Sequence, residues 1–223
     1  MRRLLGLILA RAGSKRVPDK NARPLAGSSL IERAVACARA ARSLDIIGFS
    51  SDSERYRALA HSAGLDEAYV RPTELAGDDA SSAAAALDYV AWREHADRRA
   101  ITHVVLLQPT SPLRSAVHVD AAIDTWRASG RASLVSAIAV APKSDLIIYM
   151  VDGKIRRHPA DAAPTYVLDG AIYIAPVDQL RTTGCFWNED SALYVMHPPR
   201  PWDIDTEEDF AAAAALIAAE RHP

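Results

Sequence analysis

The sequence predicts an α/β fold, with a mostly parallel sheet covered by helices on both faces. Short, continuous apolar runs alternate with amphipathic segments over residues 4–140. Continuous apolar runs are typical of strands that are buried on both faces. The chain has 223 residues, of which 49% are hydrophobic, and this size fits one large domain with a substantial core. We therefore expect a single domain over residues 1–223.

The elements of this first part can be placed in order along the chain. Residues 4–10 are expected to form the first strand, because their apolar run is unbroken until Arg11. A later helix begins at Ser81 or Ser82, and either hydroxyl suits an ordinary helix cap. The same rhythm predicts helices at about 29–42, 53–63, 81–97 and 117–129, and strands at 46–51, 68–71, 103–108 and 133–140.

The rhythm changes after Pro142. Two apolar segments flank Asp152 and Gly153, a strong signal for a two-residue hairpin, so we expect a small β-rich excursion at about 142–167. Residues 170–174 and 193–196 are expected to return to the main sheet. The last helix begins near Thr206, where a Thr-Glu-Glu-Asp run resembles a capping box.

Composition excludes several classes of protein. The formal net charge of −2 gives no support for bulk nucleic-acid binding. No apolar stretch reaches the roughly 20 residues of a membrane span, and Arg11 breaks the amino-terminal run that superficially resembles a signal peptide. Cys37 and Cys185 lack metal-binding spacing, which suits a protein of a reducing compartment. Both side chains are expected to pack in the protein interior. We expect a soluble, cytoplasmic protein.

The loop after the first strand is strongly cationic. In an open parallel sheet, ligands bind beyond the carboxyl ends of the strands. Here Arg11, Lys15, Arg16 and Lys20 surround Gly13, which permits a tight turn with backbone amides free for an anion. The loop therefore predicts a polyphosphate site, although a solvated basic turn remains the alternative. It matches neither a P-loop nor a dinucleotide-binding glycine pattern.

Two aspartates precede the last helix. Asp203 and Asp205 are two residues apart, so in an extended segment both carboxylates point to one side and can reach one hard cation. Magnesium prefers one or two carboxylates completed by water and substrate phosphates. The alternative is that these acidic residues only stabilise the start of a helix through its dipole.

Two further segments put polar groups at strand ends. Residues 108–114 supply an amide, two hydroxyls and an arginine, although most such segments are stiff turns. Residues 71–82 end a strand and open a helix, where hydroxyls and amides can bind a polar ligand edge. Histidines show neither zinc nor triad spacing, so we expect no catalytic histidine.

Six segments together resemble the CMP-sialic acid synthetases, or acylneuraminate cytidylyltransferases. They occur in that family's order and span nearly the whole chain: 9–21 (LARAGSKRVPDKN), 50–52 (SSD), 71–82 (RPTELAGDDASS), 106–114 (LLQPTSPLR), 169–174 (DGAIYI) and 203–210 (DIDTEEDF). The resemblance implies a nucleotide-diphospho-sugar transferase-like, Rossmann-like fold. It also implies a homodimer that uses the β-rich excursion as its contact, and transfer of CMP from CTP to an acidic sugar.

The resemblance also implies roles for matching residues. Those expected to bind the CTP phosphates are Arg11, Ser14 and Lys15, with Lys20 at the α-phosphate. Those expected to bind cytosine and ribose are Asn21, Arg71, Ala80, Ser81 and Ser82. Asp203 and Asp205 would hold Mg²⁺, and Gln108 would contact the acceptor. Positioning and charge neutralisation then account for most of the chemistry, and the general base is unresolved.

The chain departs from the family before residues 171–174, where relatives commonly have an arginine, a proline and Asn-Gly. Here Asp169 replaces an amide with an anion, which is unfavourable beside a carboxylated sugar unless a cation offsets it. Lys143, Arg156 and Arg157 are candidates to bind the acceptor carboxylate. A different small acid as acceptor, and a noncatalytic nucleotide-binding protein, are therefore the alternatives.

Overall fold

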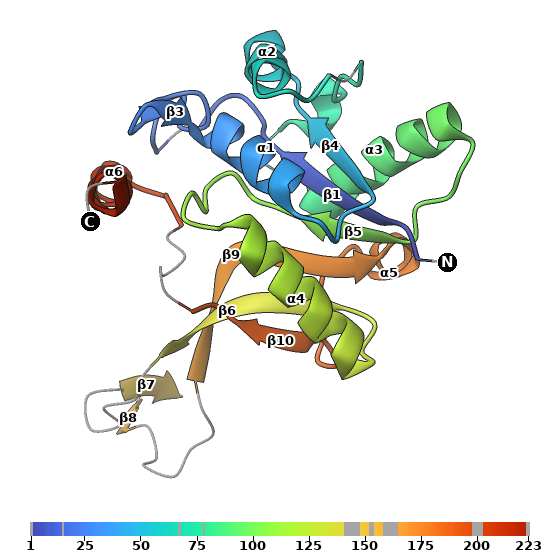
Figure 1. The fold of residues 1–223 in the computed structure, drawn as a ribbon. Helices are drawn as coiled ribbons and strands as arrows, with labels where there is room; N and C mark the ends of the chain where they lie inside the picture. Colours follow the sequence, from blue (N-terminus) through green and yellow to red (C-terminus); the bar gives the residue numbers. More distant parts are fainter. Residues whose placement is uncertain are drawn as a thin grey trace.

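The computed structural model describes residues 2–14, 16–66, 68–77, 79–140, 148–151, 154–157, 165–197 and 203–221. Its centre is a six-stranded sheet in the order β10-β6-β9-β5-β1-β4 (Figure 1). β9 is antiparallel to both neighbours and every other pair is parallel, which confirms the predicted mostly parallel sheet. The strands are β1 (Leu4–Leu9), β4 (Ile46–Ser50), β5 (His103–Leu106), β6 (Leu134–Val140), β9 (Thr165–Pro176) and β10 (Ala192–Val195).

Helices cover both faces of the sheet, as predicted. Successive side chains of β1 alternate between two apolar clusters: Leu4 and Ile8 belong to one, and Leu5 and Leu7 to the other. The first cluster includes buried residues of α1 (Leu30–Ala40), α2 (Glu54–Ser62) and α4 (Ala116–Ser129), and the second those of α3 (Ser82–Asp97) and α5 (Val177–Thr183).

The helix starts follow side-chain caps. Ser29 and Glu32 form a reciprocal capping box at α1, and Ser53 and Ser81 accept backbone N–H groups at the starts of α2 and α3. The predicted strand at 68–71 is wrong. That segment is not part of the sheet and is tied to it at Arg71, whose backbone N–H donates to the Ser51 carbonyl at 3.0 Å.

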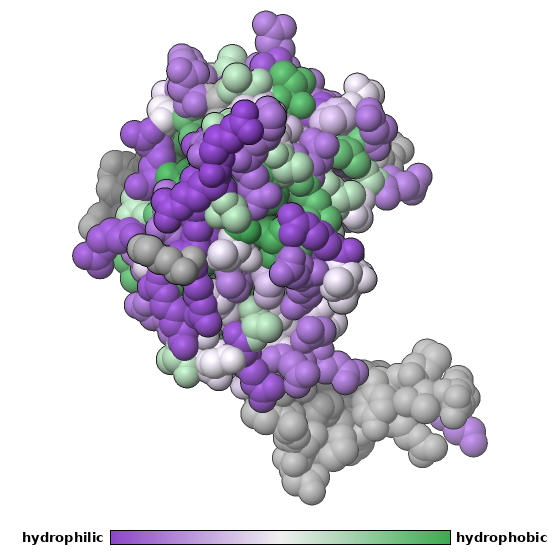
Figure 2. All heavy atoms as spheres, turned by 90° about the vertical axis from the view of Figure 1, so that its right-hand side faces the viewer, coloured by the Kyte–Doolittle hydropathy of each residue, from purple (hydrophilic) through white to green (hydrophobic). Residues whose placement is uncertain are grey.

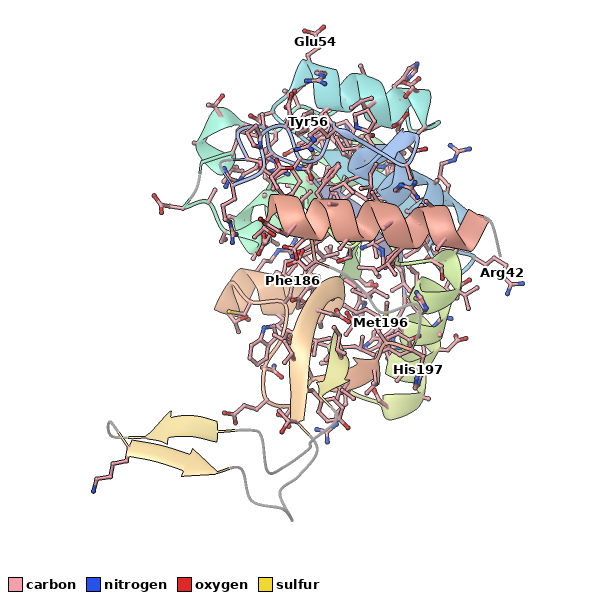
Figure 3. All side chains as sticks on the ribbon, turned by 90° about the vertical axis from the view of Figure 1, so that its left-hand side faces the viewer. Arg42, Glu54, Tyr56, Phe186, Met196 and His197 are labelled. Carbon is pink, nitrogen blue, oxygen red and sulfur yellow. The ribbon has the colours of Figure 1, made fainter. Side chains whose placement is uncertain are left out.

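The β-rich excursion contains an antiparallel pair, β7 (Ile148–Val151) and β8 (Lys154–Arg157), as predicted. The turn residues 152–153 lie outside the described part. β9 is longer than the predicted 170–174, because its first residues pair with the end of β6 in a ribbon that extends beyond the sheet (Figures 1 and 3).

A third apolar cluster fixes the segment before the last helix. α6 (Glu207–Arg221) packs Phe210 and neighbouring residues against Val17 and the short hairpin of β2 (Pro24–Leu25) and β3 (Ser28–Ser29). Asp209 accepts bonds from Thr206 and Thr206 caps the Asp209 amide in return, which confirms the predicted capping box. A short 3₁₀ turn, Thr73–Leu75, completes the elements.

The surface seen in Figure 2 is largely hydrophilic, with smaller hydrophobic areas between the polar side chains. Within the described ranges, no helix combines the length and apolar character that a bilayer crossing requires.

Candidate active site

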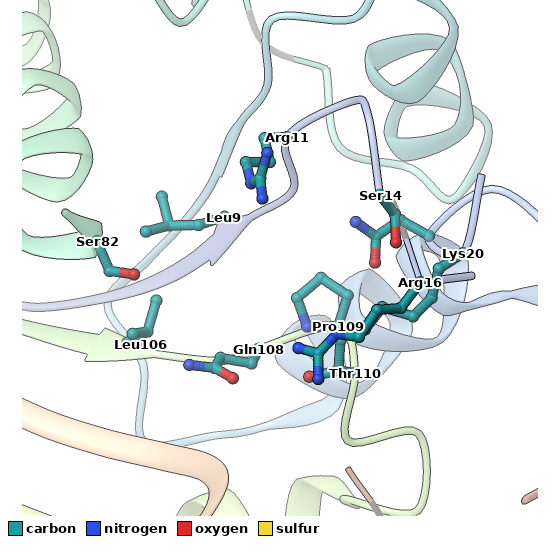
Figure 4. A pocket seen from close by; sticks show the side chains of 11 residues that line it. Leu9, Arg11, Ser14, Arg16, Lys20, Ser82, Leu106, Gln108, Pro109 and Thr110 are labelled. Carbon is teal, nitrogen blue, oxygen red and sulfur yellow. The ribbon is translucent and has the colours of Figure 1, made fainter. Parts of the chain in front are cut away.

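A cavity lies at the carboxyl edge of the sheet, and we name it the main cavity because it holds the predicted site residues. β5, β1 and β4 are adjacent and parallel, so the segments that follow them meet at one edge. The cavity encloses about 440 Å³. Its lining comes from three stretches of the sequence (Figure 4): Leu9, Arg11, Ser14, Arg16, Lys20, Asn21, Ser82, Leu106, Gln108, Pro109 and Thr110.

A second hollow of about 150 Å³ continues from this cavity, because both are lined by Leu9, Arg11 and Ser82. It adds Arg71, Leu75, Ala80, Ser81 and Ala85. The structure therefore brings together nine residues predicted to bind nucleotide or acceptor: Arg11, Ser14, Lys20, Asn21, Arg71, Ala80, Ser81, Ser82 and Gln108. Lys15 lies outside the described residues.

The basic loop is held by two carboxylates that the sequence analysis gave no role. The Ala12 amide donates to Asp52 at 3.0 Å, and the Tyr56 hydroxyl donates to Asp19 at 3.1 Å. Burial and the bond to Asp19 raise the pKa of Tyr56 to about 12, so its hydroxyl stays a donor. Gly13 has a φ of +81°, which explains glycine at the turn.

Arg71 is a buried cation at the nucleotide side. It is 5% exposed, and its Nε and Nη2 donate to the Ser50 hydroxyl and carbonyl at 2.9 and 2.6 Å. Burial lowers its pKa, although the guanidinium remains charged at neutral pH. Asn21 is 8% exposed, and its Oδ1 has no hydrogen-bond partner among the described residues. Arg71 is thus fixed at the hollow by its bonds, and the Asn21 oxygen is left to accept a bond from a ligand in the main cavity.

The aspartate pair meets the basic loop. Ile204 is fully buried and its amide donates to the Thr110 carbonyl at 3.0 Å, which pins the segment between the two carboxylates. Lys20 Nζ donates to the Ile204 carbonyl and lies 3.4 Å from Asp205 Oδ1, which is also 3.1 Å from Arg16. The aspartate pair therefore adjoins the cavity through Arg16, Lys20 and Thr110, which line it.

Asp203 has a raised pKa. Desolvation by surrounding protein atoms is the main cause, and the Asp205 charge adds to it, while the Thr110 hydroxyl and Lys20 oppose it. Two carboxylates so placed ionise together most readily when a cation neutralises them. Within the described residues, no group of three or more His, Cys, Asp or Glu side chains is placed to hold a metal.

Gln108, Gly170 and Asp203 converge from three elements. A Cβ built on Gly170 would lie 3.1 Å from Gln108 Oε1 and 3.8 Å from Asp203 Oδ2. Gly170 also has a φ of +70°, so both its backbone and its surroundings favour glycine. This junction lies where β5 ends and the register of β9 shifts, and it reaches the main cavity through Gln108, whereas Arg71 lines the adjoining hollow.

An aromatic cleft adjoins this side. It encloses about 200 Å³ and joins the main cavity through Ser82, Leu106 and Gln108. Its other walls are Tyr173, Cys185, Phe186 and Trp187. Sequence reasoning missed it, because Cys185, Phe186 and Trp187 follow α5 without a recognisable motif and Tyr173 was assigned only to a strand of the sheet. Cys185, expected to pack the interior, is instead exposed, whereas Cys37 packs against the core.

Asp169 is buried within the sheet. It is 4% exposed, and its Oδ1 accepts bonds from the Ser136 hydroxyl at 2.5 Å and the Ala171 amide at 2.9 Å. Burial raises its pKa, against the opposing effect of these bonds. Contact between this carboxylate and an acceptor therefore stays a prediction, as do the roles of Lys143 and Arg157: Lys143 and the side chain of Arg157 lie outside the described residues.

A cationic loop, a buried arginine beside a helix start, and two carboxylates at one sheet edge together define a nucleotidyltransferase. Residues 5–151 match the family model described as Cytidylyltransferase. The chain belongs to this family of enzymes.

Known relatives agree with this assignment. The chain is 30% identical to the CMP-N,N'-diacetyllegionaminic acid synthase of Legionella pneumophila, over 96% of both proteins. It is 28% identical to the N-acylneuraminate cytidylyltransferase of Escherichia coli, over 96% of this chain and 52% of that protein, so it spans about half of it. The structure of CMP:2-keto-3-deoxy-manno-octonic acid synthetase complexed with CTP shares the fold, with a TM-score of 0.74, 15% identity, and coverage of 98% of this chain and 99% of that chain.

Proposed function

We propose that the chain transfers CMP from CTP to the anomeric hydroxyl of a sialic acid or related nonulosonic acid. The hydroxyl oxygen bonds to the α-phosphorus, the bond from that phosphorus to the bridging oxygen breaks, and pyrophosphate leaves. The observation that carries the proposal is the cavity that joins the basic loop to Gln108: it continues into the hollow lined by Arg71, and two of its lining cations, Arg16 and Lys20, pair with Asp205. The activities for which the relatives are named supply the substrate class.

The nucleotide side is argued from charge and burial. Arg11, Ser14 and Lys20 line the main cavity and are suited to the phosphates, with Lys20 placed beside Asp205 for the α-phosphate. Arg71 and the Ala80 to Ser82 segment line the adjoining hollow, which suits cytosine and ribose, and Asn21, which lines the main cavity, is proposed to bind the same part of the nucleotide. Fixed cations at the phosphates stabilise the charge that develops during transfer.

Mg²⁺ is the proposed cofactor, held by Asp203 and Asp205. The fit rests on the raised pKa of Asp203 and the neighbouring Asp205 charge, since a cation relieves both. Bound there, the ion would neutralise phosphate charge. Gln108 would orient the acceptor hydroxyl, whose proton leaves to a base that the described residues do not identify.

The acceptor is proposed to extend toward the aromatic cleft. Tyr173 and Phe186 have ring centroids 6.2 Å apart, and Trp187 is half exposed beside them. Such walls suit an apolar substituent, for example the methyl group of an acyl amide, while the Ser82 hydroxyl and Gln108 amide remain within the same cleft. This geometry supports an acylated sugar acid.

A homodimer is proposed from the ribbon of β6 and β9. Three consecutive apolar side chains on β9 are exposed there: Tyr166 at 40%, Val167 at 54% and Leu168 at 44%. Neighbouring exposed apolar residues of this size mark interaction surfaces. Light scattering should then give twice the chain mass of 24.1 kDa.

We also place the enzyme in the cytoplasm, where CTP is made and both free cysteines stay reduced.

The deciding experiment incubates the enzyme with CTP, magnesium and a panel of nonulosonic acids, and measures pyrophosphate. We expect release with at least one acid, and none without acceptor. A folded protein that binds CTP but releases no pyrophosphate with any acid of the panel would contradict the proposal.

A different small acid is the second candidate, favoured by Asp169. Its carboxylate lies under the acceptor side with one oxygen unpartnered among the described residues. Mass spectrometry of products from a wider acid panel separates the two candidates. Binding of CTP without turnover on any acid would instead support a noncatalytic nucleotide-binding protein.

A further inference from the structure

β5 and β9 separate at the edge where the acceptor is proposed to bind. Their antiparallel pairing ends at Leu106 and Tyr173. Continued by two residues, the same register would place Gln108 opposite Ala171. The strands are bridged there by a side chain: Arg114 Nη1 donates to the Gln108 carbonyl and to the Ala171 carbonyl, each at 2.8 Å. One guanidinium nitrogen therefore spans the fork between the strands.

Arg114 is buried and held by its own turn. It is 5% exposed, and its backbone N–H donates to the Ser111 carbonyl at 3.2 Å. Hydrogen bonds from an ionised donor in a desolvated position are stronger than neutral ones, and losing the donor leaves carbonyls unpaired. The two bonds are thus strong enough to fix how far the strands diverge.

The fork lies directly beneath the acceptor side. Gln108 carries the amide that faces the cavity, and Ala171 follows Gly170, whose Cβ position lies 3.1 Å from that amide oxygen. Arg114 itself is not among the described residues that line the main cavity or the aromatic cleft. Arg114 therefore acts on a substrate there indirectly, through the two strands that it joins and through its charge on the buried Asp169.

We propose that Arg114 is a positioning residue for the acceptor, acting through the backbone carbonyls of Gln108 and Ala171. This inference rests on the proposed function, which assigns the acceptor to that side. The nucleotide side depends on Arg11, Lys20 and Arg71, and none of the bonds that hold Lys20 (to Ile204 and Asp205) or Arg71 (to Ser50) involves Arg114. Loss of Arg114 therefore weakens acceptor binding and leaves CTP binding in place.

The test compares Arg114→Met and Arg114→Lys with a matched control, Arg3→Met. Arg3 is also a buried arginine that donates to a backbone carbonyl, that of Arg99, at the opposite edge of the sheet. We expect R114M to raise the acceptor KM about tenfold or more, the equivalent of about 1.4 kcal/mol, with the dissociation constant of CTP changed less than about twofold. R114K keeps the charge and should recover part of the loss. R3M should lower Tm and leave both constants unchanged.

A double-mutant cycle tests whether the effect passes through Gln108. Because R114M already displaces that residue, Gln108→Ala should cost less in acceptor kcat/KM when R114M is present than alone. Equal effects of R114M on CTP and acceptor, or additive effects with Q108A, would overturn the inference. If R114M does not fold, R114K is the test: its acceptor KM should rise while its dissociation constant for CTP stays near the wild-type value.

The two proposals fail differently. A wild-type enzyme without turnover on any acid overturns the proposed function, and this inference with it. A wild-type enzyme with turnover, whose acceptor KM is indifferent to both Arg114 substitutions, overturns this inference alone.

Discussion

Asp205 illustrates how a single carboxylate can have two roles. In the structure it forms ion pairs with Lys20 and Arg16, and these pairs connect the basic loop to the segment before α6. During the proposed reaction the same carboxylate would bind Mg²⁺ together with Asp203, while Lys20 and Arg16 would bind phosphate oxygens. Its ion pairs are partly exposed, so they contribute little to stability by themselves.

We predict that Asp205→Asn lowers magnesium-dependent turnover about a hundredfold, the equivalent of about 2.7 kcal/mol in the barrier, because one of the two carboxylates is lost. Steady-state kinetics over a magnesium titration provides the measurement. Asp190→Asn is the matched control, since Asp190 is an exposed aspartate paired with Arg131 far from the cavity. Unchanged turnover in D205N would remove Asp205 from the metal site.

Asp169 gives a prediction with a defined sign. Burial raises its pKa, so the folded state holds the proton more tightly than the unfolded state does. Its stabilising contribution is complete below the unfolded pKa and is lost as pH rises through the folded pKa. Asp169→Asn cannot ionise and its oxygen can still accept from Ser136 and Ala171. We therefore expect a higher Tm than wild type at pH 8 and a smaller difference at pH 4.

Turnover provides the functional side of the Asp169 prediction. Removing a buried anion beneath the acceptor should lower the KM for a carboxylated acceptor, since like charges repel. Kinetics with the best acid of the panel measures this. A KM that rises in D169N would show that the chain requires the charge, in favour of the different-acid candidate.

At the scale of elements, the bend in β9 at Gly170 couples the sheet to the site. We predict that Gly170→Ala lowers both stability and turnover, because its φ of +70° disfavours a side chain and the added Cβ would press on Gln108 at 3.1 Å. Gly130→Ala separates these causes. Gly130 has a similar φ of +67° at the end of α4, with nothing within 4 Å of the added Cβ.

Both glycine variants should lose about 1 kcal/mol of unfolding free energy through the backbone. Only G170A should also lose turnover, about tenfold or more if Gln108 is displaced. Denaturant titration and kinetics measure the two effects. Equal turnover in both variants would show that Gln108 is not positioned by this bend.

The elements also show what sequence could predict. Apolar runs and serine caps located most strands and helices, and motifs at the ends of parallel strands were expected to meet because those ends share an edge. β9 was predicted too short, since its first four residues, Val167 among them, are not buried and give no alternating or continuous apolar pattern of a buried strand. The aromatic cleft and the Arg114 fork were not predictable, because each depends on contacts between segments far apart in the chain.

At the scale of the whole molecule, the end of the sheet opposite the cavity carries a pH-sensitive contact. His103 begins β5, and its ring packs edge-on against Trp126, 4.7 Å between centroids, while Arg2 lies over the same Trp126 ring. Burial, with a smaller effect of Arg2, lowers the pKa of His103 to about 4. The folded protein therefore holds this histidine neutral where the unfolded chain would protonate it.

We predict that acid destabilises the fold through His103. Between its unfolded pKa of 6.5 and its folded pKa of about 4, the unfolded state binds more protons, so unfolding free energy falls as pH falls through this window. At pH 5 the loss relative to pH 8 is about 2 kcal/mol. His103→Phe keeps an aromatic ring beside Trp126 without a titrating group, and should make the unfolding free energy depend less on pH.

Denaturant titrations at both pH values measure this free energy. His61→Gln is the control, because the His61 side chain on α2 is exposed. An H103F variant with the full wild-type dependence would assign the acid sensitivity to other groups, among them His118, whose pKa is also lowered by burial.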